Sequence, residues 1–332
     1  VLSWIVVGAF NWKVGLIIGF IFIILACFLL LRLKTPAEYF YRGLLYWKKL
    51  EYEAAFYQFN KAASDGHAEA QNKLGLCYQK GLGVQEDYSR AFYWYQKAAE
   101  QGNADAQNNL GYCYFNGQGV LQDKQKAIYW YRKAAEQGYA MAQYNLGVNY
   151  ANGFGVKQDI AEAVKWYQKA AEQGNADAQF ELGIRYENGD GVQQNRFEAF
   201  YWYQKAAEQG NADAQNNLGY CYFNGQGVLQ DKQKAIYWYR KAAEQGYAMA
   251  QYNLGVNYAN GFGVKQDIAE AVKWYRKAAE QGNADAQNNL GYCYSNGQGV
   301  LQDKQKAIYW FRKAAAQGSE IAKNNLKTIL NQ

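Results

Sequence analysis

A 36-residue repeat occupies most of this chain and limits the folds that it can adopt. Each unit is too short to bury an apolar core of its own, so neighbouring units must supply the missing contacts. Repeats of about 20–50 residues are typical of solenoids and similar arrays. The seven units run from His67 to Gly318 and start at residues 67, 103, 139, 175, 211, 247 and 283.

Some of these units are nearly identical. The block 103–138 recurs unchanged as 211–246, and the block 139–174 recurs as 247–282 with a single substitution. Such similarity indicates recent internal duplication. It leaves little room for one unique catalytic centre, because a centre within the duplicated blocks would be present twice.

One unit, read from Asn103, predicts a pair of helices. Asn103 can cap the first helix, and small or apolar residues such as Leu110 follow at helical spacing. Gly111 is costly inside a helix, so we expect it to permit close approach of another helix. The segment 116–119, Asn-Gly-Gln-Gly, ends the helix because its glycines tolerate positive φ.

The second half of the unit predicts the second helix. Asp123 can cap it, and Ala127, Trp130, Tyr131 and Ala134 form a stripe at helical spacing. All seven units keep an Asp or Asn at the capping position and a tryptophan in the stripe. We therefore predict an all-α fold of stacked helix pairs.

The string AxAQxxLGxxYxxGxGVxxDxxxAxxWYxKAAEQG resembles the Sel1-like repeat, a relative of the tetratricopeptide repeat, over residues 67–318. The resemblance implies an α-α superhelical solenoid. Residues 36–66 lack the GxG loop and resemble a plain tetratricopeptide helix pair, which predicts an N-terminal cap. Residues 319–332 repeat only the first helix and predict a C-terminal cap; Lys327 stands there where full units have glycine.

Residues 14–33, VGLIIGFIFIILACFLLLRL, follow a flank at 1–13 and predict a transmembrane anchor. Twenty helical residues span about 30 Å, the thickness of a bilayer core. A bacterial lipoprotein cleavage box ending at Cys27 is the alternative, and the bulky apolar residues after that cysteine argue against it. Because the chain begins with Val1 rather than Met, a fragment that has lost an earlier span is a further interpretation.

The basic residues beside this segment predict its orientation. Arg32, Lys34, Arg42 and the pair Lys48–Lys49 follow it, whereas Lys13 precedes it. The positive-inside rule then places the repeats in the cytoplasm, with the periplasmic side as the alternative. The absence of Asn-x-Ser/Thr acceptor sites is compatible with a bacterial source.

The resemblance also implies a scaffold or adaptor whose first helices line a concave face and bind a protein or peptide. A recurring amide occupies position seven of the unit on that face. An amide both donates and accepts hydrogen bonds, so a row of them could hold a peptide backbone; alternatively, each could bond a neighbouring repeat. The row consists of Asn109, Asn145, Asn217, Asn253, Asn289 and, in the cap, Asn325.

Two further sets of residues are candidates for partner binding. Tyr112, Tyr220 and Tyr292 recur at position ten, and tyrosine is common at interfaces, although packing between helices is the alternative. The unit 175–210 departs from the duplicated pattern with Glu181 and Arg185, so it is the predicted site of specificity.

The residue types in this chain give little support for functions other than protein binding. The chain has one histidine, His67, which we interpret as a helix cap, and no metal-ligand spacing or phosphate loop. We therefore expect no enzyme activity, cofactor, metal, small-molecule substrate or nucleic-acid partner; a hydrolase is the least favoured alternative. A structural spacer or self-associating solenoid is the other alternative. Four cysteines recur at one helical position and are expected to be buried, and the fifth is Cys27.

Overall fold

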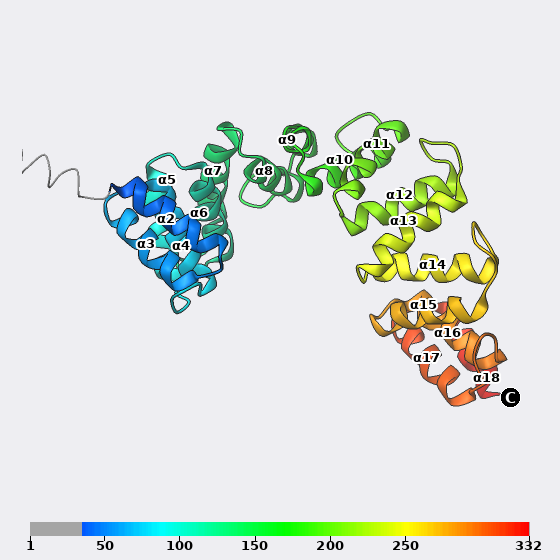
Figure 1. The fold of residues 1–332 in the computed structure, drawn as a ribbon. Coiled ribbons are helices and arrows are strands. Elements are labelled where there is room, and N and C mark those ends of the chain that lie inside the picture. The colour runs from blue at the N-terminus through cyan, green and yellow to red at the C-terminus, as the bar shows by residue number, and fades with distance from the viewer. Residues whose placement is uncertain (1–34, 332) are drawn as a thin grey trace, which may run out of the picture. The chain divides into compact units, whose positions relative to one another are not determined.

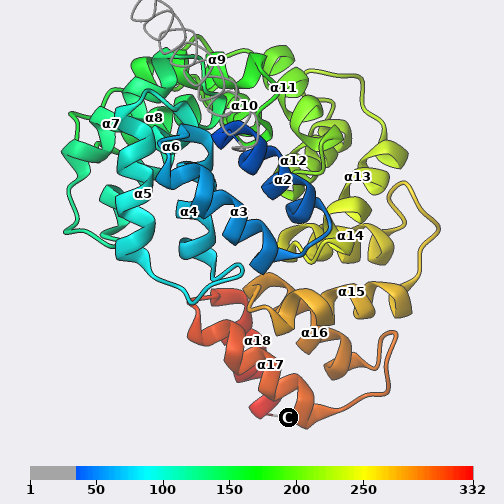
Figure 2. The same cartoon turned by 60° about the vertical axis from the view of Figure 1, so that its left-hand side comes forward.

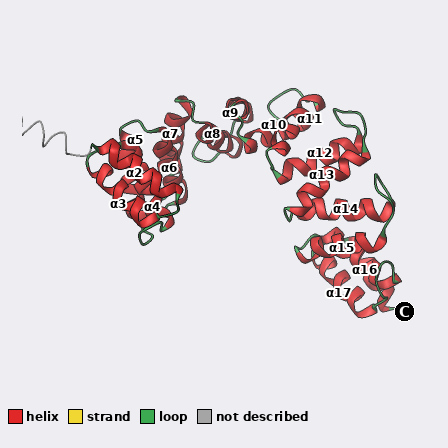
Figure 3. Cartoon of the chain, viewed as in Figure 1, coloured by secondary structure: helices red, strands yellow, loops and turns green. Residues whose placement is uncertain are grey.

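A computed structural model describes residues 35–331, which form helices joined by loops and turns (Figures 1 and 3). These residues contain no strand, which confirms the all-α prediction. None of the helices among residues 35–331 has the length and apolar character needed to cross a membrane. The predicted membrane span at 14–33 and its flank at 1–13 lie outside the described residues.

Each repeat contributes two helices, as the capping and glycine pattern predicts. The described helices are α2 (Pro36–Lys48), α3 (Tyr52–Ser64), α4 (Ala68–Lys80), α5 (Tyr88–Glu100), α6 (Ala104–Asn116), α7 (Lys124–Glu136), α8 (Ala140–Asn152), α9 (Ile160–Glu172), α10 (Ala176–Asn188), α11 (Arg196–Glu208), α12 (Ala212–Asn224), α13 (Lys232–Glu244), α14 (Ala248–Asn260), α15 (Ile268–Glu280), α16 (Ala284–Asn296), α17 (Lys304–Ala316) and α18 (Glu320–Leu330).

The chain forms two compact units, one ending at Gln137 and the other starting at Gly138. The first contains α2–α7 and the second contains α8–α18. Within each of them every helix packs on the helices before and after it in the chain, as Figures 1 and 2 show. Each is thus a repeated solenoid of helix pairs.

The predicted helix caps are present. The side chain of Asn103 accepts a hydrogen bond from the backbone N–H of Ala106 at 2.8 Å, and that of Asp123 accepts one from Lys126 at 2.9 Å. His67 caps α4 through Nδ1, which accepts from the N–H of Ala70 at 3.3 Å, as its position predicted. These bonds satisfy donors that the first turn of a helix leaves without a partner.

Glycine inside the first helix permits a close approach, and the approaching group is the second helix of the same repeat. A Cβ atom added to Gly111 would lie 2.8 Å from ring carbon Cδ1 of Tyr131 and 3.2 Å from the carbonyl oxygen of Ala127. The same arrangement recurs at Gly219 and Tyr239. No second helix follows α18 among the described residues, which explains why Lys327 is tolerated there.

The GxG loop joins the two helices of one repeat and packs against the preceding repeat. Its first glycine, Gly117, ends α6 in the left-handed conformation at φ 71°. Its second glycine, Gly119, lies against the backbone of Tyr88 in the preceding repeat, and a Cβ atom there would overlap the carbonyl oxygen of Tyr88. Both glycines are therefore required, the first by its conformation and the second by space as well.

A buried glutamine joins three helices at each repeat boundary. Nε2 of Gln215 donates to the carbonyl oxygen of Ala207 in the preceding repeat at 3.1 Å. Its Oε1 accepts a hydrogen bond of 2.8 Å from Nε2 of Gln245, at the end of its own repeat. Gln215 is only 3% exposed, so these bonds replace the water that burial removes. This clamp was not predicted, although glutamine recurs at both positions in all seven units.

Candidate partner-binding face

Within each compact unit, the first helices present one side chain from each helical turn on the same side of the helix. In α16 these are Asp285, Asn289, Tyr292 and Asn296, at positions 3, 7, 10 and 14 of the repeat. Their spacing of three or four residues places them on one side of the helix. Asn289 is half-buried and the other three are exposed. We call the surface formed by these four positions the first-helix face.

The predicted tyrosines lie on this face and are accessible. Tyr112, Tyr220 and Tyr292 are 44%, 45% and 50% exposed. In the intervening repeats the face carries Met141 and Met249, which are also exposed. The three tyrosine rings are therefore not core residues, and packing between helices does not account for their position.

The asparagine row forms hydrogen bonds between repeats at several positions. Nδ2 of Asn253 donates to Oδ1 of Asn216 in the preceding repeat at 3.0 Å. Asn109 makes the same bond to Asn72 at 3.0 Å. The equivalent bond from the cap, Asn325 to Asn288, measures 2.9 Å. The second interpretation of the row, a bond to a neighbouring repeat, thus holds at these three positions.

The remaining members of the row have other surroundings. Asn217 accepts a hydrogen bond from Asn216 at 3.3 Å, and Asn145 is half-buried on α8. Asn289 lies within hydrogen-bonding reach of the phenol groups of Tyr252 and Tyr275. Burial raises the pKa of both phenols, and the hydrogen bond with the Asn289 amide partly offsets that rise.

Charged residues replace the row in the unit 175–210, where the structure brings Glu181 and Arg185 together. Nη2 of Arg185 lies 3.1 Å from Oε2 of Glu181, and Nη1 lies 3.6 Å from Oδ2 of Asp190. The Arg185 side chain is 19% exposed. In the same repeat, the hydroxyl of Tyr203 donates to Oε2 of Glu187 at 2.5 Å. This repeat therefore has a local charged cluster, of which Glu181, at position 7, lies on the first-helix face.

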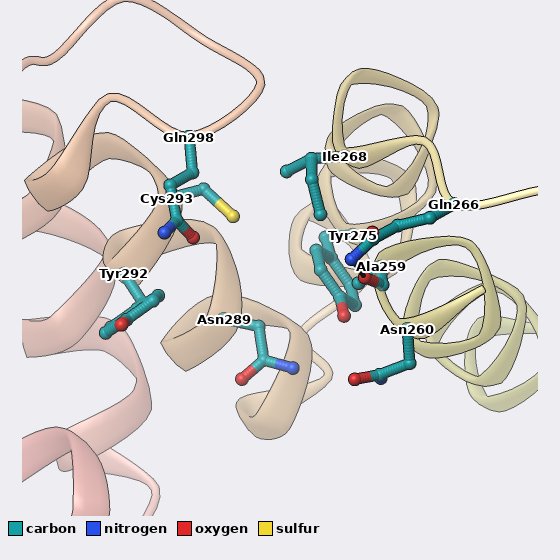
Figure 4. Close-up of a pocket in the computed structure, with 9 residues that line it drawn as sticks. All are labelled: Ala259, Asn260, Gln266, Ile268, Tyr275, Asn289, Tyr292, Cys293 and Gln298. Carbon is teal, nitrogen blue, oxygen red and sulfur yellow. Dashed lines mark hydrogen bonds between the residues drawn. The ribbon is translucent and has the colours of Figure 1, made fainter. Parts of the chain in front are cut away.

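A notch of about 550 Å³ opens on this face between the repeats 247–282 and 283–318. Two predicted site residues, Asn289 and Tyr292, line it. In Figure 4, Asn289 and Asn260 face each other across it, and the Sγ atom of Cys293 points toward the other wall. The full lining is Ala259, Asn260, Gln266, Ile268, Tyr275, Asn289, Tyr292, Cys293 and Gln298.

Charge separates between the two helices of the repeats. The seven second helices contain 21 Lys and Arg residues against 9 Asp and Glu residues; they are α5, α7, α9, α11, α13, α15 and α17. The seven first helices contain 3 Lys and Arg residues against 7 Asp and Glu residues; they are α4, α6, α8, α10, α12, α14 and α16. The first-helix face is therefore neutral to acidic. This separation of charge was not predicted, although a sum of the charges in each predicted helix shows it in the sequence.

The described residues offer no metal site. Within residues 35–331 no group of three or more His, Cys, Asp and Glu side chains is placed to hold a metal ion. Four cysteines in this part of the chain are free and buried, and burial raises the pKa of the Cys113 thiol to about 12. Such thiols are protonated at neutral pH and behave as small apolar side chains.

Comparison with known proteins identifies the repeats. The Sel1 repeat family matches seven consecutive segments, at residues 68–103, 104–139, 140–175, 176–211, 212–247, 248–283 and 284–319. No curated protein matches the chain.

Two solved structures are similar to this chain. One is a protective antigen present in uropathogenic Escherichia coli strains that displays an SLR fold, with 39% identity and a TM-score of 0.80. That similarity covers 89% of this chain and 64% of the antigen, so the chain spans less than two thirds of the antigen's length. The other is a Sel1 repeat protein from Oxalobacter formigenes, with 37% identity, a TM-score of 0.67, and coverage of 89% and 86%.

Proposed function

Because this chain belongs to the Sel1 repeat family, we propose that it is a membrane-anchored scaffold that binds a protein or peptide partner on its first-helix face. Solenoids of Sel1-like and tetratricopeptide-like repeats generally mediate protein–protein interactions and are typically not enzymes. The family therefore supports partner binding in general, and the residues of this chain supply the particular surface.

The exposed tyrosines carry this proposal. Tyr112, Tyr220 and Tyr292 are held on rigid helices with about half of each side chain accessible. A tyrosine offers a large contact area and a hydroxyl while losing little conformational entropy, so it is a frequent anchor of protein interfaces. Tyr220 and Tyr292 recur at the same position in separate repeats of the second compact unit, which suits a partner that extends along several repeats of that unit.

Charge favours a neutral or basic partner. The first helices carry more acidic than basic residues, 7 against 3. An acidic peptide would be repelled by this surface, whereas a basic segment would be attracted to it over roughly 8–10 Å at physiological salt.

The membrane anchor rests on the sequence of residues 14–33. Its apolar length suits a single span, and the basic residues after it favour a cytoplasmic location of the repeats. Protease treatment of spheroplasts tests this placement. Protection of the repeats until the membrane is disrupted supports it, whereas digestion from outside places them on the periplasmic side.

Crosslinking in native membranes tests partner binding. We expect a protein that copurifies with the wild-type chain to be lost from a triple variant, Tyr112→Ala, Tyr220→Ala and Tyr292→Ala. The matched control changes Tyr129, Tyr237 and Tyr309, which lie on second helices of the same repeats and are 50%, 51% and 49% exposed. Equal capture by both triple variants would refute binding on the first-helix face.

The same preparation separates the proposal from the alternative of a self-associating spacer. Crosslinks only between copies of this chain, together with sedimentation that depends on its concentration, would favour self-association. A heterologous crosslinked protein with a monomeric purified chain supports the scaffold.

A further inference from the structure

The boundaries between repeats within the second compact unit are filled in different ways. The one between 247–282 and 283–318 opens into the notch of about 550 Å³, and a smaller notch of about 140 Å³ lies between 283–318 and the C-terminal cap. We call the contact between two successive repeats a joint. Three repeat positions are compared between joints: position 13 of the earlier repeat and positions 11 and 16 of the later one. At the open joint, between 247–282 and 283–318, these residues are Ala259, Cys293 and Gln298, and all three line the notch.

Aromatic rings fill the corresponding space one joint earlier. There Phe223 is the counterpart of Ala259, and Phe262 is the counterpart of Gln298. Their ring centroids are 5.9 Å apart. Nζ of Lys232, the counterpart of Ile268, lies 4.5 Å from the centroid of Phe262. Two rings under a lysine thus occupy the region that is open at the next joint.

A guanidinium group fills the space at the joint between 139–174 and 175–210. Position 13 is again alanine, Ala151, but Arg185 stands where the open joint has Cys293. Arg185 pairs with Glu181 and Asp190, the counterparts of the lining residues Asn289 and Gln298. It also lies within hydrogen-bonding reach of Tyr167, the counterpart of Tyr275. Its guanidinium therefore lies where the notch opens in the later joint.

The groups that fill these two closed joints indicate which kind of side chain the open joint can bind. Both fillers are flat groups, a pair of rings in one and a guanidinium in the other. The guanidinium requires the carboxylates of Glu181 and Asp190, whereas all nine residues that line the open notch are uncharged. A buried cation without a counter-charge is costly, so an arginine from a partner is disfavoured there. An aromatic ring needs no such compensation.

We propose that the notch between α14, α15 and α16 binds an aromatic side chain of the partner peptide. This inference rests on the proposed function and specifies one contact within it. The notch volume of about 550 Å³ exceeds that of one ring, so part of the peptide backbone fits beside it. Ala259, Ile268 and Cys293 contact the ring, while the amides of Asn260 and Asn289 bond the peptide or a tyrosine hydroxyl.

Side-chain analogues test this preference on the full chain. The methyl NMR signal of Ile268, at the wall of the notch, is followed during titration with N-acetyl-tyrosinamide, N-acetyl-leucinamide and N-acetyl-argininamide. We expect the tyrosine analogue to bind about 3- to 10-fold more tightly than the other two. Equal affinities, or a preference for the leucine or arginine analogue, would overturn the proposal.

Two variants exchange features between joints. Ala259→Phe introduces the residue of the closed joint, Phe223, and should abolish the titration. Its control is Lys265→Leu in the loop of the same repeat, which also introduces a residue of the preceding repeat and should bind as the wild type does. Conversely, the triple variant Glu181→Asn, Arg185→Cys and Asp190→Gln should open a further notch and raise the number of bound tyrosine analogues by one. An unchanged titration in Ala259→Phe would also overturn the proposal.

The partner crosslinking separates this inference from the function on which it rests. If the partner is lost from the first-helix tyrosine variant but retained fully by Ala259→Phe, the scaffold stands and the notch proposal falls. If no partner is crosslinked at all, the scaffold proposal fails whatever the analogue titration shows.

Discussion

The ring of Tyr131 lies directly against the backbone of Gly111, so that a single added methyl group would come within 2.8 Å of it. The contact joins the two helices of one repeat, and the tyrosine ring is almost completely buried. It explains a glycine in mid-helix, where this residue ordinarily costs about 1 kcal/mol relative to alanine.

Replacing that glycine should destabilise the chain. We expect Gly111→Ala to lower the free energy of unfolding by about 1–3 kcal/mol, because overpacking outweighs the better helix propensity of alanine. Urea denaturation followed by circular dichroism measures it. Tyr112→Ala, at the next and exposed position, is the control and should change stability by less than about 0.5 kcal/mol. A stabilised Gly111→Ala would show that the ring moves aside without cost.

The buried glutamine clamp should contribute to the cohesion of neighbouring repeats. Gln215→Leu removes a donor to Ala207 and an acceptor for Gln245, and we expect a loss of about 1–3 kcal/mol of unfolding free energy. Gln204→Leu is the control, because the Gln204 amide bonds only the exposed Glu208 of its own helix. Equal losses in the two variants would argue against a special role for the buried residue.

The asparagine row should affect stability as well as binding. In Asn253→Ala the Oδ1 atom of Asn216, a residue that is 7% exposed, loses the donor that Asn253 provides. We expect a loss of about 1 kcal/mol. Asn224→Ala serves as a control, since its amide bonds only the carbonyl of Tyr220 on the same helix. If Asn253→Ala is as stable as the control, the amide is available to a partner instead.

The buried thiols should be unreactive in the native chain. Burial raises the pKa of Cys113 and Cys221 to about 12, so almost no thiolate is present at pH 8. We expect iodoacetamide to modify both only after denaturation in urea, as read by mass spectrometry of the peptides that contain them. Rapid modification of the native chain would indicate frequent local opening of α6 or α12.

The raised pKa of these buried thiols predicts how the free energy of unfolding depends on pH. The unfolded chain releases thiol protons near pH 9, whereas the folded chain retains them up to about pH 12. The folded state therefore binds more protons in this interval, and the free energy of unfolding should fall as pH rises from about 9 to 12. Cys113→Ala and Cys221→Ala together should reduce that slope; an unchanged slope would assign it to other groups, such as the buried tyrosines.

The features predicted correctly from the sequence depend on residues close together in the chain. Asn103 and Asp123 cap their helices because the cap bond reaches only three residues forward. Gly117 ends α6 for a similarly local reason. The close approach at Gly111 was also predicted, but its partner, Tyr131, became known only from the packing of the two helices.

The features that were missed depend on pairs of residues in different repeats. Gln215 is polar, and polarity alone predicts exposure, although its repetition in every unit was a signal. The notch arises because Ala259 and Cys293 are both small, and neither residue is unusual by itself. Arg185 closes the corresponding joint only because its carboxylate partners lie on the same repeat. The tyrosines of the first-helix face are exposed, and their role in partner binding stays a prediction.

The position of Gly119 against the backbone of Tyr88 has a consequence for how this gene can grow. A GxG loop packs against the start of a helix in the preceding repeat. A single inserted repeat must therefore fit a preceding repeat of different sequence. The duplication limits this problem, because the block 103–174 reappears as 211–282 with one substitution and both sides of its internal boundary are copied together; only the first loop of the copy meets a different neighbour, Arg196 in place of Tyr88. Recombination that respects boundaries can lengthen the chain without new compensating mutations, which makes the adjoining pair, rather than the 36-residue unit, the natural module for engineering longer or shorter relatives.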